Sequence, residues 1–201
     1  HIVYTGPMSV GINFGPDGAL YAADWAGGYP MNDKGAVWKL DDPTIAKSAI
    51  RQEVSKFLKN GTDKVSSADL IKRLSHKDMR IRLDAQRELA KREAAIAELQ
   101  QVIASSTSDQ LAKIHAIWAL SQHRRFFEKA FHSLAMSKDP ILRAQAAKHA
   151  AETLKGTDPL LTKLLADSDP QVRFHAATAI WKTSDATAID AVISLLEENN
   201  N

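Results

Sequence analysis

The sequence predicts a mainly α-helical protein, a right-handed superhelix of stacked helix pairs preceded by a small antiparallel β-meander. Seven of the nine glycines lie at or before Gly35, which separates a turn-rich part from a helix-rich part. In the helix-rich part, four aspartates that are each followed four places later by a basic residue recur at intervals of 31, 30 and 30 residues. A period of this length is typical of repeat architectures built from helix pairs.

The turn-rich part, residues 1–43, resembles a β-meander in its residue pattern. Gly15-Pro16-Asp17-Gly18 has the composition of a tight turn, and it lacks the spacing and the following helix of a phosphate-binding loop. Asn32-Asp33-Lys34-Gly35 fits a second hairpin turn, with half a calcium loop as the alternative. We therefore expect strands at Ser9–Phe14, Ala19–Ala23 and Gly35–Leu40, with His1–Thr5 as a fourth candidate. So few strands cannot bury enough surface to fold alone.

Residues 44–66 are predicted to form a connector with one capping helix over Ala46–Lys59, and residues 67–201 about four helix pairs, the last one truncated. The second helix of each pair begins after a capping aspartate, which accepts hydrogen bonds from the free N–H groups of the first turn. Those aspartates are Asp78, Asp109, Asp139 and Asp169. The shorter first helices are expected at Ala68–Leu74, Ala95–Ile103, Phe126–Met136, Pro159–Leu165 and Ala188–Leu196.

The second helices carry one narrow apolar face of small residues. In the last of them, Val172, Ala176 and Ala179 recur at helical spacing, and the alanines permit close helix packing. A pair of about 30 residues buries such a face only by stacking on its neighbours, which predicts a solenoid. Trp118 and Trp181 lie within apolar stretches of these helices, so we expect both rings in the core.

Composition excludes several kinds of chemistry. The 201 residues contain no cysteine, so this stretch has no disulfide, thiolate nucleophile or cysteine-bound metal. No apolar run reaches the length of a membrane span. The net charge of +2 is a mild excess that permits an acidic partner without requiring nucleic acid. Because the chain begins at His1 without a leader, we expect it to be a piece of a longer polypeptide.

The stretches Gly11–Trp25 and Gly35–Leu40 resemble one blade of the β-propeller in soluble quinoprotein glucose/sorbosone dehydrogenases. The helices resemble HEAT repeats of the short, phycobilin-lyase-like type. A blade followed by such helices, together with the stretches His76–Gln86 and Ile114–Leu120, resembles the large membrane-bound dehydrogenase proteins of planctomycetes and verrucomicrobia. Those proteins combine an N-terminal propeller, a HEAT region and a C-terminal c-type haem domain.

This resemblance implies a periplasmic or other extracytoplasmic parent enzyme that oxidises sugars or alcohols with pyrroloquinoline quinone (PQQ) and calcium. It also makes Asp24 and Trp25 candidates for cofactor binding, because the end of that strand faces the central channel of a propeller. The alternative is a turn-capping pair with a packed ring. The chain holds at most one blade and no Cys-x-x-Cys-His motif. We therefore expect neither a cofactor nor catalysis in this segment.

Several polar residues of the repeats have two interpretations. The basic residues Arg82, Lys113, Arg143 and Arg173 are placed to pair with the repeat aspartates, although their regular spacing also suits phosphate binding. His115 and His175 occupy the same place in their repeats, which indicates either repeat drift or a metal site. The best candidates for a partner surface, with plain solvated charge as the alternative, are Arg80, Arg87, Lys91, Arg124 and Arg125.

Three hypotheses of function follow from these patterns. The first is a protein-interaction module whose second helices hold a partner or a neighbouring domain of the parent chain. The second is the propeller–HEAT junction of a quinoprotein-type dehydrogenase. The third is a HEAT-like nucleic-acid binder, which is disfavoured because aromatic and basic residues are not interleaved along one groove.

Overall fold

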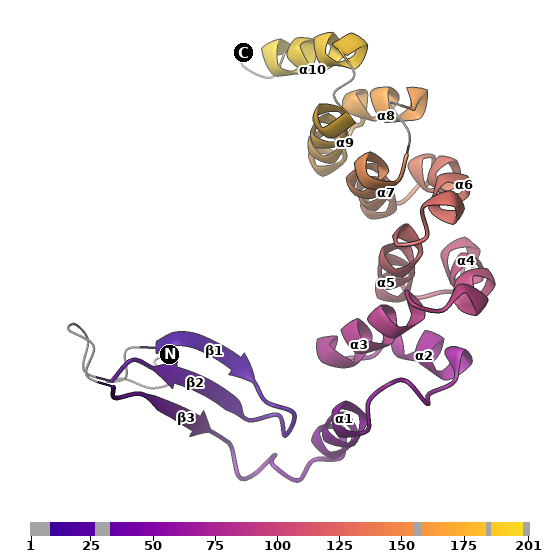
Figure 1. Ribbon diagram of the computed structural model, residues 1–201. Coiled ribbons are helices and arrows are strands. Elements are labelled where there is room, and N and C mark those ends of the chain that lie inside the picture. Colours follow the sequence, from indigo (N-terminus) through magenta and orange to yellow (C-terminus); the bar gives the residue numbers. More distant parts are fainter. Residues whose placement is uncertain (1–8, 27–32, 155–157, 184–185, 199–201) are drawn as a thin grey trace. The chain divides into compact units, whose positions relative to one another are not determined.

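The computed structural model describes residues 9–26, 33–154, 158–183 and 186–198, apart from the side chains of residues 124–126, 186–187 and 198. The chain forms two compact units, His1–Lys64 and Val65–Asn201 (Figure 1). The first unit holds the strands and one helix, and the second holds the helix pairs. The candidate strand His1–Thr5 lies outside the described residues. The mainly helical fold with a small N-terminal sheet is therefore as the sequence predicts.

The sheet of the first unit is an antiparallel meander of β1 (Ser9–Phe14), β2 (Leu20–Asp24) and β3 (Ala36–Leu40), in the order β1-β2-β3. Ile12 pairs with Ala22, and Ala22 pairs with Trp38 on the other side. Successive side chains of a strand alternate between the faces, so one face carries these three residues together with Phe14. Ala22 is fully buried, but Ile12, Phe14 and Trp38 remain exposed.

Asp17 organises the turn between β1 and β2. Its Oδ1 accepts a hydrogen bond from the N–H of Ala19, and its Oδ2 accepts one from the Tyr21 hydroxyl and lies 2.8 Å from Lys39 Nζ. The Lys39 ammonium is the main reason that the pKa of Asp17 falls well below its ordinary value. Gly18 has a φ of +77°, a conformation that glycine adopts without strain. The four residues thus form the plain turn that their composition predicts.

Helix α1 (Ala49–Asn60) is joined to this turn by Arg51. The Nε and Nη2 atoms of Arg51 donate to the carbonyl oxygen of Asp17 at 2.9 and 2.7 Å, and its Nη1 lies 2.7 Å from Asp41 Oδ1. Val54 and Phe57 form the buried side of the helix. Gly61, at a φ of +71°, ends it and donates its N–H to the carbonyl of Phe57.

The second unit consists of helix pairs. The first helices are α2 (Ser67–Arg73), α4 (Ile96–Ala104), α6 (Arg124–Ala135), α8 (Pro159–Lys163) and α10 (Ala186–Glu198). The second helices are α3 (Met79–Leu89), α5 (Gln110–Ser121), α7 (Pro140–Thr153) and α9 (Pro170–Thr183). Two 3₁₀ turns, η1 (Glu93–Ala95) and η2 (Leu164–Ala166), precede α4 and follow α8.

The second helices form one layer of this unit, because α3 contacts α5, α5 contacts α7, and α7 contacts α9. The first helices α2, α4, α6 and α8 each pack against the second helix of their own pair, and α10 packs against α9, as the succession along Figure 1 shows. The core between the layers holds Phe127 and Phe131 of α6 with Ala146, Ala147 and other small residues. Alanine at these places lets α7 and α9 approach closely, so the unit is a solenoid whose register depends on small side chains.

Each second helix begins with the predicted aspartate cap. Asp78, Asp109, Asp139 and Asp169 each accept a hydrogen bond at 2.8 or 2.9 Å from the N–H two residues further on. Pro140 and Pro170 occupy the first helical position of α7 and α9, where a missing N–H has no consequence. The first helix α8 uses the same device with Asp158 and Pro159.

Candidate interaction surface on the second helices

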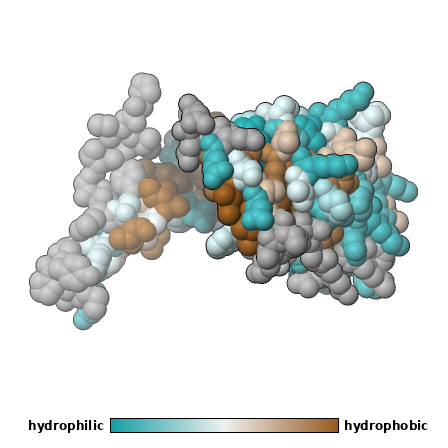
Figure 2. All heavy atoms as spheres, turned by 90° about the horizontal axis from the view of Figure 1, so that it is seen from above, coloured by the Kyte–Doolittle hydropathy of each residue, from teal (hydrophilic) through white to brown (hydrophobic). Residues whose placement is uncertain are grey.

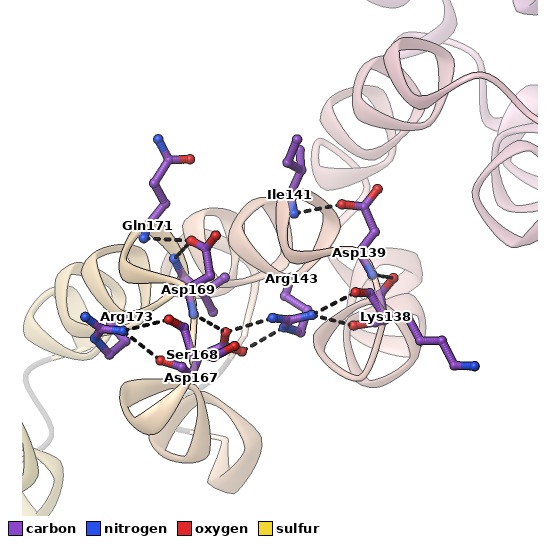
Figure 3. Close-up of polar contacts among 11 residues, drawn as sticks. Lys138, Asp139, Ile141, Arg143, Asp167, Ser168, Asp169, Gln171 and Arg173 are labelled. Atoms are coloured by element: carbon purple, nitrogen blue, oxygen red, sulfur yellow. Dashed lines mark hydrogen bonds and ion pairs between the residues drawn. The ribbon is translucent and has the colours of Figure 1, made fainter.

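The arginine at this place in three of the repeats, those of α3, α7 and α9, joins its helix to the preceding loop. Arg143 Nη1 donates to the carbonyls of Ser137 and Lys138, and Arg173 Nη1 donates to those of Asp167 and Ser168 (Figure 3). Arg82 does the same with His76 and Lys77. The expected pairing with the repeat aspartate of the same helix is thus replaced by carbonyl contacts. The reason is geometric, because the aspartate oxygens already cap the helix and the guanidinium reaches past them to the loop.

Arg143 also makes an ion pair between two helix pairs. Its Nε and Nη2 lie 2.7 and 2.8 Å from the two carboxylate oxygens of Asp167, which precedes α9 (Figure 3). Both side chains are largely buried. The Arg143 guanidinium lowers the pKa of Asp167 below its ordinary value. Such a bidentate pair fixes the relative placement of α7 and α9 more strongly than an exposed pair would. The role that the sequence predicted, keeping neighbouring repeats in register, is therefore present at this position.

A second set of polar contacts crosses from α3 to α7. His115 Nε2 accepts from Arg82 Nε at 3.1 Å, and its Nδ1 lies 2.7 Å from Gln86 Oε1, so Nδ1 carries the proton. Burial, with the Arg82 charge adding to it, lowers the pKa of His115 to about 4. Trp118 follows, and its Nε1 donates to Gln145 Oε1 at 2.7 Å. These contacts tie three successive second helices together through buried or half-buried side chains.

Each second helix also exposes one large apolar residue in its N-terminal half, and this apolar row was not predicted from the sequence. Its members are Met79 on α3, Leu111 on α5, Ile141 on α7 and Phe174 on α9, with exposed fractions of 58%, 43%, 39% and 66%. Leu111 and Ile141 hold the same repeat position, two places after the capping aspartate. Met79 stands one place and Phe174 five places after its capping aspartate, so aligning the repeats on the aspartates would have revealed only the Leu111 and Ile141 position.

The predicted partner-surface residues lie partly on this layer. Arg87 and Lys91 are exposed, and each lies near a carboxylate one turn away, Asp84 at 3.7 Å and Glu88 at 3.1 Å. Arg80 is half-buried and makes an ion pair of 2.7 Å with the capping Asp78. The side chains of Arg124 and Arg125 lie outside the described residues. The α3 arginines therefore form charge-compensated pairs, and their role in binding stays a prediction.

Asp24 and Trp25, the candidate cofactor residues, end strand β2. Asp24 Oδ2 accepts a hydrogen bond from Trp38 Nε1 at 2.8 Å, so this carboxylate orients the Trp38 ring across the sheet. Trp25 is half-buried. In the described part of the chain, no cluster of three histidine or carboxylate side chains is placed to hold a metal ion. The contribution of these two residues to a PQQ or calcium site stays a prediction.

Trp118 and Trp181, both predicted to lie in the core, differ in their exposure. Trp118 is half-buried and hydrogen-bonded within the layer, whereas Trp181 is 72% exposed at the surface of α9. Trp181 stands twelve places after the capping aspartate, and the corresponding residue of α7, Ala151, is only half-buried. The core prediction for Trp181 is therefore wrong, because this repeat position lies toward the surface of the helix.

Comparison with known proteins identifies the helix pairs. Residues 127–201 match the family model described as HEAT repeats, which supports the HEAT-repeat part of the resemblance. No curated protein matches the chain. Among solved structures, the crystal structure of an engineered protein matches with 20% identity and a TM-score of 0.37, over 64% of this chain and 67% of that one. Within the described residues, every helix is too short or too polar to cross a bilayer.

Proposed function

We propose that the second-helix layer binds a protein partner, so that the helical unit serves as a scaffold or protein-interaction module. The apolar row carries this proposal. Large apolar side chains at the surface of consecutive stacked helices are characteristic of interaction sites rather than of free surface. Figure 2 shows hydrophilic and hydrophobic residues side by side on the visible face of the helical unit. A solenoid presents such a row as one extended surface.

Site-specific photocrosslinking tests this proposal. A photoreactive phenylalanine analogue at Leu111 or Ile141 should give adducts with a protein, and excess unlabelled chain should compete them away. The matched control places the analogue at Met136, which is 73% exposed but lies at the end of a first helix. Ile141→Glu should remove the adducts of the analogue at position 111, and Leu111→Glu those of the analogue at position 141, without loss of helical circular dichroism. Equal adduct formation at Met136 would contradict a specific second-helix surface.

We further propose that the first unit belongs to a propeller-containing dehydrogenase of the quinoprotein type. Two features support this. The stretch Gly11–Trp25 resembles a propeller blade, and the meander exposes Ile12, Phe14, Val37 and Trp38, apolar residues that neighbouring blades would cover. The strands in Figure 2 accordingly carry apolar residues on their visible surface. PQQ would supply the two-electron redox chemistry in the parent, with calcium beside it.

A dye-linked oxidation assay tests this second proposal. The longer protein, reconstituted with PQQ and calcium, should reduce an artificial electron acceptor when a sugar or polyol is added. Asp24→Asn should weaken quinone binding measured by fluorescence quenching if the carboxylate takes part in the site. Full quinone binding by the variant would assign Asp24 only its hydrogen bond to Trp38. Absence of quinone binding by the parent itself would count against the whole proposal.

A further inference from the structure

A groove of about 210 Å³ lies on the second-helix layer between α7 and α9. It is lined by Lys148, Phe174, His175, Thr178, Ala179 and Lys182. Two of these residues carry an ammonium group, one an imidazole and one an exposed aromatic ring. The groove therefore combines hydrogen-bond donors with an apolar wall, and it lies beside the Phe174 end of the apolar row.

The repeat provides an internal control for this groove, because His115 and His175 share one repeat position. Both ring nitrogens of His115 are engaged, by Arg82 and by Gln86. At the positions that correspond to these two partners, the preceding helix α7 has Arg143 and Ala147. Arg143 is held by Asp167 and by loop carbonyls, and alanine offers no polar group. The two hydrogen bonds that engage the ring nitrogens of His115 thus have no counterpart at His175, whose ring borders the groove.

The charge of the groove is positive. Lys148 Nζ lies 5.5 Å from the centre of the Trp118 ring, which holds this ammonium by its π-face rather than by a carboxylate. Lys182 Nζ lies 3.4 Å from Glu152 Oε1 at the exposed rim, so its charge is partly compensated. Burial, and after it the Lys148 charge, lowers the pKa of His175. The region thus disfavours a further positive charge, and a carboxylate would be attracted to it.

The aromatic wall favours a protein ligand over a bare anion. The Phe174 ring is two-thirds exposed and packs edge-to-face on His175 with 5.3 Å between ring centres. A single carboxylate matches the single uncompensated ammonium of Lys148, and an apolar side chain next to it would cover Phe174. A polyphosphate backbone has no apolar side chain to cover Phe174, so this ring favours the protein ligand.

We propose that the α7–α9 groove binds a carboxylate side chain from an acidic segment of the protein partner, with a neighbouring apolar side chain packed on Phe174. This inference rests on the proposed scaffold function and specifies the chemistry of its partner. Lys148 and Lys182 recognise the carboxylate, and Phe174 selects an apolar neighbour. Thr178 is not counted among the recognition groups, because its hydroxyl donates to the Phe174 carbonyl within α9.

Fluorescence anisotropy with a labelled peptide of alternating glutamate and leucine tests the groove directly. Lys148→Gln with Lys182→Gln should weaken binding about tenfold at low salt, and less as added salt screens the charges. Phe174→Ala should weaken the glutamate–leucine peptide more than a glutamate–serine peptide. The matched control is Lys129→Gln with Lys163→Gln, which removes two exposed lysines from the first helices α6 and α8. That variant should bind within about twofold of the original chain.

Equal weakening in the control variant would overturn the inference, because it would indicate diffuse charge attraction. Inorganic phosphate that competes as well as the peptide, or anionic lipid vesicles that bind in its place, would also overturn it. The result is separable from that of the scaffold function. If Leu111→Glu abolishes the photocrosslinked adduct while the Lys148 and Lys182 variant keeps it, the second-helix layer binds a partner but the groove does not.

Discussion

Arg143 and Asp167 show how single residues hold the repeats in register. The guanidinium donates to both carboxylate oxygens of Asp167 and to two carbonyls of the loop before α7. One side chain therefore connects α7 to the loops that precede α7 and α9. Removing it would leave a largely buried carboxylate without its cation. Buried charges that lose a partner are costly, whereas exposed pairs contribute little.

Arg143→Gln is therefore expected to lower the free energy of unfolding by about 1–2 kcal/mol at pH 7. Because the folded-state pKa of Asp167 is lowered, the pair stabilises the protein above the unfolded pKa near 4, and this contribution is lost as the pH falls through the folded value. Urea denaturation at pH 7 and pH 3 measures both effects. Lys163→Gln, at an exposed site, should change stability by less than about 0.5 kcal/mol.

The buried histidines predict a second pH effect. Burial is the main reason that the pKa of both His115 and His149 falls to about 4. The unfolded chain binds these protons from about pH 6.5 downward, whereas the folded chain does not, so stability falls between pH 6.5 and 4. We expect a loss of about 2 kcal/mol for His115 over this range. His115→Gln should flatten the stability profile over this range, and an unchanged profile would contradict the assignment.

At the scale of whole elements, α7 and α9 pack through small side chains. Ala147 and Ala177 occupy the same repeat position, but Ala147 is fully buried and Ala177, on the last second helix, is half-buried. Ala147→Leu should destabilise the protein by about 1–3 kcal/mol because the added atoms have no space. Ala177→Leu should be nearly neutral. Thermal unfolding followed by circular dichroism compares the two, and equal effects would contradict this packing.

The elements themselves could be predicted because their signals are local. The aspartate caps, the following prolines and the Gly15–Gly18 turn act within a few residues, so composition and spacing placed them correctly. The partners of Arg143, His115 and Trp118 could not be predicted, because they come from other helices 24 to 33 residues away. The groove beside His175 could not be predicted for the same reason. It forms because Arg143 and Ala147 of α7 do not make the contacts that Arg82 and Gln86 make with His115.

At the scale of the molecule, the two units should unfold independently. Gly18 has a positive φ, and a Cβ there would lie 2.7 Å from Arg51 Nε. Gly18→Ala is therefore expected to destabilise the strand-containing unit by about 1–2 kcal/mol. The helical signal of residues 65–201 should keep its midpoint. In a chain with Trp118→Phe and Trp181→Phe, tryptophan fluorescence reports only the first unit, while far-ultraviolet circular dichroism reports mainly the helices. Urea titrations of this chain separate the two transitions, and a common shift would indicate a single cooperative unit.

In the repeats of α3, α7 and α9, the contact between the arginine and its own preceding loop is local to the repeat. The arginine reaches carbonyls only five and six residues behind it, and the cap and the first turn are equally local. A copy of residues 139–168 inserted after Ser168 would bring its own aspartate, its own arginine and its own Asp167. The length of the binding layer is thus adjustable in steps of one repeat. A longer partner can be matched by adding modules, with no redesign of the junctions between them.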